Sequence, residues 1–205
     1  MKKYKLYGDS RSGNCYKAAL IMRLTGQPFE WVETDLMAQA TRRKEFLALN
    51  PNGKVPLLQF PDGRCLAESN AMLLHLSRNS EWFAQDEWQQ ALNWQWLFFE
   101  QYSHEPYIAV ARFIALFLKQ ETEQAERLIM LRERGHQALA VMESTLGTFK
   151  FLTGDNPTVA DIALYAYTHV AHEGGFDLRG YPAIRNWMGT LEAQEGWMAM
   201  AEACS

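Results

Sequence analysis

The periodicity of apolar residues changes near residue 80, and this change limits the folds that the chain can adopt. Before that point, short strand patterns alternate with short helical patterns. After it the strand patterns stop, and long amphipathic helices are expected at residues 86–118, 121–146, 158–172 and 182–194. We therefore predict the class α/β + all-α, with an α/β domain followed by an all-helical domain.

The first 80 residues give a more specific prediction. Strand patterns fall at residues 3–7, 28–33, 55–60 and 64–67, and helical patterns follow Asn14 up to Gly26 and cover residues 41–48 and 68–76. The order βαβαββα is typical of a thioredoxin-like sandwich, in which helices cover a small mixed sheet. We predict a thioredoxin-like N-terminal domain over residues 1–78 and an all-helical C-terminal domain over residues 86–205.

Charge is distributed unevenly between these two parts. Residues 1–80 carry 12 Lys and Arg against 7 Asp and Glu, whereas the whole 205-residue chain has a net charge of −4. A basic first domain suits a small anionic ligand. The acidic total gives no basis for nucleic-acid binding, which needs a clustered basic surface. With 48% apolar and 21% charged residues, the composition is that of a globular protein.

Cysteine usage and the N-terminal residues indicate a cytoplasmic protein. Cys15, Cys65 and Cys204 are widely spaced and form no CxxC pair, so we expect reduced thiols and no metal site. Lysines at positions 2, 3 and 5 interrupt any signal-peptide core. No apolar run approaches the ~20 residues that cross a bilayer, so membrane insertion is not expected.

Four motifs, in this order and at these distances, resemble the cytosolic glutathione transferase superfamily, in particular its bacterial serine-type theta-like and nu-like members. They are Ser12-Gly13-Asn14-Cys15, Asn50-Pro51-Asn52-Gly53-Lys54-Val55-Pro56, Glu68-Ser69-Asn70-Ala71 and Thr158-Val159-Ala160-Asp161. The resemblance covers essentially the whole chain. It implies a homodimeric detoxification enzyme that uses glutathione as co-substrate, with no other cofactor, and a small apolar electrophile as its second substrate.

The first motif bears on activation of a thiol. A free thiol has a pKa of about 8.5, and lowering it by about 2 units requires roughly 2.7 kcal/mol of differential stabilisation. A hydroxyl that donates to the sulfur at a helix N-terminus can supply much of this. The resemblance assigns that role to Ser12, with Asn14 as a second thiol-facing group in the nu-like manner. Ser10 is an alternative donor, and Cys15 is interpreted as a buried, inert thiol rather than a catalytic cysteine.

The second and third motifs bear on binding of the rest of glutathione. Val55-Pro56 resembles the cis-proline element of thioredoxin-like folds, where the preceding residue offers its backbone to a peptide ligand. Lys54 is a candidate partner of a carboxylate. The resemblance implies that Ser69, at a helix N-terminus, binds the γ-glutamyl carboxylate and that Glu68 binds its ammonium group.

The fourth motif has a structural interpretation. Thr158 followed by Asp161 has the spacing of a capping box, so we expect it to stabilise a helix rather than to take part in chemistry. In the helical domain the electrophile pocket is expected to be lined by His104, Tyr107 and Phe113. Aromatic residues at helical spacing also fit an ordinary core, so this assignment depends on the resemblance.

Two alternative functions use the same residues. A glutathione-dependent disulfide reductase would use the same site with a second thiol compound as substrate. A non-catalytic transferase-fold module for protein interaction would dispense with glutathione contacts, yet Ser12, Val55-Pro56 and Glu68-Ser69 are all present. The sequence favours an enzyme and does not choose between conjugation and disulfide reduction.

Overall fold

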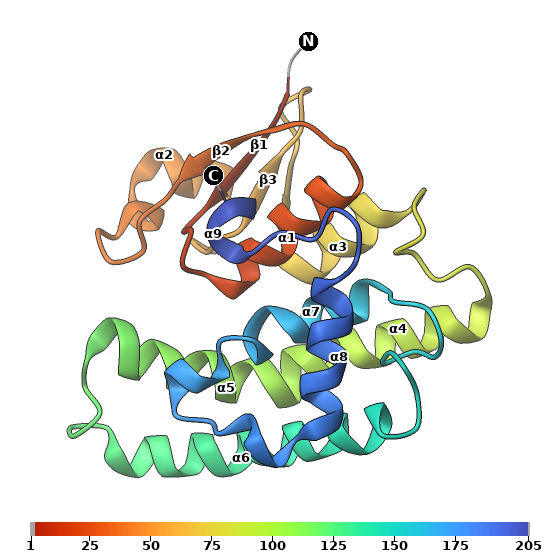
Figure 1. Cartoon of the computed structure of the whole chain (residues 1–205). Helices are drawn as coiled ribbons and strands as arrows, with labels where there is room; N and C mark the ends of the chain where they lie inside the picture. The colour runs from red at the N-terminus through yellow and green to blue at the C-terminus, as the bar shows by residue number, and fades with distance from the viewer. Residues whose placement is uncertain (1–2, 205) are drawn as a thin grey trace. The chain divides into compact units, whose positions relative to one another are not determined.

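The computed structural model describes residues 3–204, so residues 1–2 and 205 of the two predicted domains lie outside it. The chain forms two compact units (Figure 1). One comprises Met1–Ser80 together with Gln194–Ser205, and the other comprises Glu81–Ala193. We describe each unit separately.

A four-stranded mixed sheet forms the centre of the first unit. Its strands β1 (Tyr4–Gly8), β2 (Phe29–Glu33), β3 (Leu57–Gln59) and β4 (Cys65–Ala67) lie in the order β2-β1-β3-β4. β1 pairs parallel with β2 and antiparallel with β3, and β3 pairs antiparallel with β4. The sheet confirms the thioredoxin-like class predicted from the sequence.

Helices α1 (Gly13–Leu24) and α3 (Ser69–Ser77) pack beside one another in this unit (Figure 1). The side chains of α1 between Cys15 and Met22 are all fully buried, because the run of apolar residues faces both the sheet and α3. The helix predicted over residues 41–48 is divided into a 3-10 turn, Ala40–Arg42, and α2 (Lys44–Leu49).

The C-terminal segment packs with the first unit, whereas the predicted division kept it with the helical domain. Its short helix α9 (Met200–Ala203), which we did not expect, lies against α1 (Figure 1). The Tyr16 hydroxyl donates to the carbonyl oxygen of Met198 at 2.6 Å. Apolar burial of Ala203 and Cys204 explains why so short a helix is held in place.

The second unit is helical and begins with one long rod. The rod consists of α4 (Glu87–Phe99), the π-helical segment η2 (Glu100–His104), α5 (Glu105–Arg112) and a second π-helical segment η3 (Phe113–Leu118). The sequence predicts a helix at residues 86–118, and the rod confirms it. Pro106 has no N–H to donate to the preceding turn, which is a physical reason for the widened π-helical hydrogen bonding before it.

The remaining helices complete this unit. They are α6 (Ala125–Leu146), α7 (Val159–Thr168), the 3-10 turns Ala171–Gly174 and Leu178–Gly180, and α8 (Pro182–Glu192). α7 is buried along its whole length, and α6 packs against both α5 and α8. No helix among residues 3–204 combines the length and apolar character needed to cross a membrane.

The predicted capping box at the start of α7 is confirmed. Thr158 is the N-cap, and its backbone N–H donates to Asp161 Oδ2 at 2.8 Å. The buried carboxylate of Asp161 also accepts from Leu152 N at 3.0 Å and from Trp187 Nε1 at 2.8 Å. The motif therefore ties α7 to two other segments of the helical unit and has no part in the candidate site.

Candidate functional site

Ser12 lies where β1 gives way to α1. It is the N-cap of α1, with extended backbone angles, and its Oγ accepts from the backbone N–H of Cys15 at 3.4 Å. The backbone N–H of Ser12 donates to the carbonyl oxygen of Asp9 at 2.9 Å. A hydroxyl that accepts a cap bond can still donate its hydrogen, so the half-buried Ser12 can both cap the helix and donate to an anion.

The second candidate of the first motif, Asn14, joins the third motif. Ser69 Oγ donates to Asn14 Oδ1 at 3.2 Å, so the starts of α1 and α3 share a hydrogen bond although 55 residues separate them. One turn further along α1, the buried Lys17 donates from Nζ to Asn70 Oδ1 at 3.4 Å. The two motifs that the sequence assigned to the sulfur and to the γ-glutamyl group thus form one polar cluster.

Glu68, immediately before α3, has an unusual backbone conformation. Its φ of 70° lies in the left-handed region, which residues other than glycine rarely adopt. Such a conformation costs on the order of 1–3 kcal/mol and is commonest at ligand sites. The side chain of Glu68 is exposed, and that of the next residue, Ser69, is buried. In this arrangement Glu68 can reach out to a ligand and Ser69 can anchor it.

The loop before β3 carries the second motif. The peptide bond between Val55 and Pro56 is cis, as the resemblance implied. Asn50, which is buried, fixes the loop: its Nδ2 donates to the carbonyl oxygen of Lys54 at 2.8 Å, and its Oδ1 accepts from Asn52 N. Lys54 itself is exposed. The sequence identified Asn50 only as the first residue of the second motif, and the structure shows that its side chain fixes the loop.

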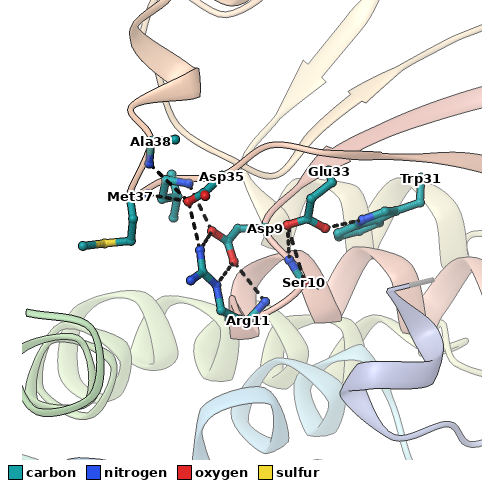
Figure 2. Close-up of polar contacts among 9 residues, drawn as sticks. Asp9, Ser10, Arg11, Trp31, Glu33, Asp35, Met37 and Ala38 are labelled. Carbon is teal, nitrogen blue, oxygen red and sulfur yellow. Dashed lines mark hydrogen bonds and ion pairs between the residues drawn. The ribbon is translucent and has the colours of Figure 1, made fainter.

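A charged network surrounds the turn between β1 and α1 (Figure 2). The buried carboxylate of Asp9 accepts two side-chain bonds from Arg11, at 2.8 and 2.7 Å, and one from Leu36 N at 3.1 Å. Burial alone would raise the pKa of Asp9, but the bonds from Arg11 and Leu36 outweigh it and hold the pKa below its usual value. Asp9 and Arg11 were not identified as site residues from the sequence. Their Asp-x-Arg spacing was the one feature that could have indicated a turn with a paired carboxylate.

Cys15 has the environment of an inert thiol. It is fully buried, and burial raises the pKa of its thiol to about 12, with a hydrogen bond from Ser12 offsetting only part of this effect. A thiol with so high a pKa is almost entirely protonated at neutral pH and is a poor nucleophile. This agrees with the interpretation of Cys15 as a buried, unreactive side chain.

The structure places the three residues assigned to the electrophile pocket in different surroundings within the helical unit. His104 is fully buried and shares a 3.0 Å hydrogen bond with the hydroxyl of Thr168. Phe113 is 38% exposed and stacks on Phe117 with ring centroids 5.5 Å apart. Only Tyr107 lines a described groove, of about 390 Å³, together with residues of α6 that include Arg134.

Neutral polar groups gather at the starts of α1 and α3. Among residues 3–204, no group of three or more His, Cys, Asp or Glu side chains could hold a metal ion. Ser12, Asn14 and Ser69 instead offer hydroxyl and amide groups at two helix N-termini, where the helix dipoles favour negative charge. A thiolate and a carboxylate on one small molecule are suitable ligands for such a surface.

The fold and these motifs define a two-part protein, a thioredoxin-like unit with a polar cluster at the starts of α1 and α3, followed by a helical unit. The family model described as "Glutathione S-transferase, N-terminal domain" matches residues 6–82. The model described as "Glutathione S-transferase, C-terminal domain" matches residues 81–190. The chain belongs to the glutathione transferase family.

Comparisons with individual proteins agree with this assignment. The crystal structure of a glutathione S-transferase from Pseudomonas fluorescens Pf-5 is 50% identical, with a TM-score of 0.94 and coverage of 96% of this chain and 98% of that chain. "Glutathione S-transferase 2" of Anopheles gambiae is 32% identical over 78% of this chain and 76% of its own length.

Two further relatives carry names of other kinds. "Disulfide-bond oxidoreductase YfcG" of Escherichia coli is 28% identical, over 85% of this chain and 83% of its own length. "Elongation factor 1-gamma" of Artemia salina is also 28% identical over 93% of this chain, which spans only 44% of that longer protein. Membership of the family therefore does not by itself determine which reaction this protein catalyses.

Proposed function

We propose that this protein is a glutathione transferase that binds glutathione on its thioredoxin-like unit, stabilises the thiolate and directs it at an apolar electrophile. Ser12 donates its hydroxyl hydrogen to the sulfur, and Asn14 contributes a second polar group beside it. Stabilising the thiolate supplies the nucleophile, and binding both substrates supplies proximity. The bond formed is a thioether between the glutathione sulfur and the electrophilic carbon, and the electrophile's leaving group departs with the bonding electron pair.

The hydrogen bond between Ser69 Oγ and Asn14 Oδ1 carries this proposal. It brings the sulfur-facing start of α1 to the carboxylate-binding start of α3, so one tripeptide can span both. The backbone of Val55, the side chain of Lys54 and the exposed carboxylate of Glu68 complete the proposed glutathione contacts. Glu68 would pair with the ammonium group of glutathione and Lys54 with a carboxylate.

Disulfide reduction is the second candidate, because Asn14 lies two residues after Ser12, the spacing that resembles the nu-like members. Asn14 Oδ1 accepts from Ser69 Oγ and so belongs to the polar cluster at the starts of α1 and α3. The relative named as a disulfide-bond oxidoreductase makes this reaction relevant to the family. In that reaction the glutathione thiolate attacks one sulfur of the disulfide and releases the other sulfur as a thiolate. A second glutathione then attacks the mixed disulfide, which releases the second thiol and forms oxidised glutathione.

We also propose that the protein acts in the cytoplasm as a homodimer. Three aromatic side chains, Trp94, Phe98 and Tyr102, recur every four residues along the long rod and are 48%, 74% and 82% exposed. An exposed aromatic row of this kind is typical of an interaction surface. Sedimentation of the wild type and of a Phe98→Ser variant tests it: a dimer that dissociates in the variant supports the proposal, and a monomeric wild type contradicts it.

The first test measures the bound thiol directly. Thiolate absorbance of glutathione is titrated against pH in the presence of wild type, Ser12→Ala and Asn14→Ala. We expect the wild type to lower the thiol pKa by about 2 units and Ser12→Ala to lose about 1–2 units of that shift. A shift that survives in Ser12→Ala but not in Asn14→Ala would transfer the role to Asn14, and absence of glutathione binding would favour the interaction module.

The second test separates the two reactions. Turnover is compared between an aromatic halide with glutathione and a small disulfide such as that of 2-hydroxyethanethiol with glutathione. A higher kcat/KM with the halide supports conjugation, and the reverse result supports reduction. The variants Tyr107→Ala and Phe113→Ala test the proposed electrophile contacts, since loss of such a contact raises KM for the halide without changing glutathione binding.

A further inference from the structure

We propose that the ion pair between Asp9 and Arg11 is a positioning device that holds the hydroxyl of Ser12 where it can donate to the glutathione sulfur. This inference rests on the proposed role of Ser12. Neither residue is assigned a contact with glutathione, so both act through Ser12.

Two successive backbone N–H groups of the turn are held by side-chain carboxylates (Figure 2). Ser10 N donates to Glu33 Oε1 at 3.1 Å, and Arg11 N donates to Asp9 Oδ1 at 3.1 Å. Ser12 N donates to the carbonyl oxygen of Asp9 at 2.9 Å. Three successive N–H groups are therefore fixed, and Asp9 accepts two of the three bonds. Of these two bonds, one is at the Asp9 carboxylate and the other, from Ser12 N, is at the Asp9 backbone carbonyl oxygen, so Asp9 links Arg11 to the backbone from which the Ser12 side chain extends.

Asp9 is in turn anchored to the segment that follows β2. Its Oδ2 accepts from Leu36 N at 3.1 Å, and Arg11 Nη2 bridges the carboxylates of Asp9, at 2.7 Å, and Asp35, at 3.0 Å. Asp35 Oδ1 also accepts from the backbone N–H groups of Met37 and Ala38 (Figure 2). The turn is thus connected to a second, sequence-distant segment, which limits the directions in which it can relax.

The same local pattern occurs twice more without such an anchor. In Asp62-Gly63-Arg64, the aspartate accepts from the backbone N–H of Arg64 at 3.0 Å and from its Nε at 2.7 Å. In Asp177-Leu178-Arg179, the backbone bond is 2.9 Å and the shorter Nε bond is 2.9 Å. The Asp62 and Asp177 side chains are 51% and 56% exposed, compared with 2% for Asp9.

This comparison separates two levels of organisation. The Asp-x-Arg sequence is sufficient to form the turn, since all three copies form it. Burial of the carboxylate and the bridge to Asp35 distinguish the copy that precedes Ser12. A buried carboxylate with a bidentate arginine partner is rigid, whereas an exposed pair exchanges its bonds with water. The position of this rigid copy, one residue before the N-cap of α1, indicates its role.

The experiment combines an Arg11 variant with the Ser12 variant. Arg11→Gln is the preferred change because the Arg11 side chain is 45% exposed, whereas Asp9 is buried and its replacement endangers folding. The pKa of enzyme-bound glutathione is measured from thiolate absorbance in wild type, Arg11→Gln, Ser12→Ala and the double variant. Arg64→Gln, in the exposed copy of the same turn, is the matched control, and circular dichroism confirms that each variant is folded.

If Arg11 acts through Ser12, Arg11→Gln raises the bound thiol pKa by about half a unit or more and has no further effect in the Ser12→Ala background. Arg64→Gln leaves the pKa unchanged. A shift that persists in the Ser12→Ala background would mean that the arginine charge acts on the sulfur directly, and this overturns the inference. No shift in Arg11→Gln, combined with a clear shift in Ser12→Ala, overturns the inference and leaves the proposed function intact.

Two further results complete the test. Arg11→Lys keeps the charge but loses the two-pronged geometry, so we expect it to resemble Arg11→Gln, and full rescue by lysine would overturn the positioning role. If Ser12→Ala itself leaves the thiol pKa unchanged while glutathione still binds, the role proposed for Ser12 fails, and the positioning role fails with it. The failure of each proposal therefore produces a different result.

Discussion

The starts of α1 and α7 use similar chemistry for different purposes. Each helix begins with a hydroxyl N-cap, Ser12 or Thr158, and each has a buried aspartate three residues away, Asp9 or Asp161. Thr158 is 4% exposed, and its hydroxyl lies within hydrogen-bonding distance of Thr153, Asn93 and Asp161. Ser12 is half-buried and accepts a cap bond from Cys15 N.

The two aspartates differ in a corresponding way. Asp9 has a cationic partner in Arg11, and its pKa is lowered. Asp161 is bonded by backbone N–H groups and by Trp187, but burial dominates and raises its pKa. A buried N-cap such as Thr158 stabilises the fold. A half-buried N-cap such as Ser12, held in a turn by a charged network, can also contact a ligand.

Replacing Asp161 by alanine is expected to have the largest effect. The change removes the acceptor of four hydrogen bonds, from Leu152 N, Thr158 N, Thr158 Oγ1 and Trp187 Nε1, and leaves these buried donors without that partner. We expect the free energy of unfolding to fall by about 3–5 kcal/mol, measured by urea denaturation. The control is Thr145→Ala in α6, which removes a half-buried hydroxyl that donates to the carbonyl oxygen of Val141 in the same helix. Equal, small losses in the two variants would contradict a structural role for Asp161.

A pair of cap variants separates stability from chemistry. Thr158→Ala is expected to lower the free energy of unfolding by about 0.5–2 kcal/mol and to leave the bound glutathione pKa unchanged. Ser12→Ala is expected to raise that pKa by about 1–2 units. Denaturation and thiolate titration are measured on both proteins. A comparable pKa shift in Thr158→Ala would remove the distinction between the two caps.

The pH dependence of stability should have opposite signs at the two aspartates. The folded pKa of Asp9 is lowered, so its contribution is present above the unfolded value of about 3.9 and is lost as pH falls through the folded pKa. The folded pKa of Asp161 is raised, so its ionisation reduces stability as pH rises from about 3.9 through the folded pKa. Urea denaturation across this range checks both.

The informative quantity is the difference in stability between wild type and each asparagine variant. For Asp9→Asn the stability advantage of the wild type should shrink as the pH is lowered below about 4. For Asp161→Asn the wild type should lose stability relative to the variant as the pH is raised from about 4. If the stability difference between the wild type and the variant changes with pH in the same direction at both positions, Arg11 does not control the ionisation of Asp9.

The smallest effect is expected in the exposed copy of the Asp-x-Arg turn. Asp62→Asn removes an ion pair with Arg64 whose side chains are 51% and 80% exposed, and solvent screens such a pair. We expect no measurable change in the urea midpoint or in the bound glutathione pKa. Asp177→Asn, whose wild-type carboxyl has a pKa lowered to about 2 by Arg179, should behave in the same way. A large fall in the urea midpoint of either variant would show that the exposed Asp-x-Arg turn is by itself enough to stabilise the protein.

Much of the architecture was predictable because local patterns specify it. Alternation of apolar residues located the four strands, and the Thr158–Asp161 spacing located a cap that the structure confirms. The short helix α9 was not predictable, since four residues have little intrinsic helical stability and depend on packing against α1. The division of the long rod into α-helical and π-helical segments was missed for a similar reason, because periodicity does not distinguish them.

The candidate site was predictable only residue by residue. The motifs marked Ser12, Asn14 and Ser69 individually, and the hydrogen bond between Asn14 and Ser69 appears only after the sheet brings α1 and α3 together. His104 illustrates the converse. It was assigned to a pocket from its place in an aromatic segment, and the fold buries it against Thr168. Helical spacing identifies a face, and neighbouring elements decide what that face contacts.

The three Asp-x-Arg turns show where sequence information ends. Asp9, Asp62 and Asp177 each form a turn with the arginine two residues on, because the acceptor and donor lie within reach of one another along the chain. The burial of Asp9 and the bridge from Arg11 to Asp35 arise only in the folded protein. Burial and long-range bridging depend on distant segments, and no local pattern contains that information.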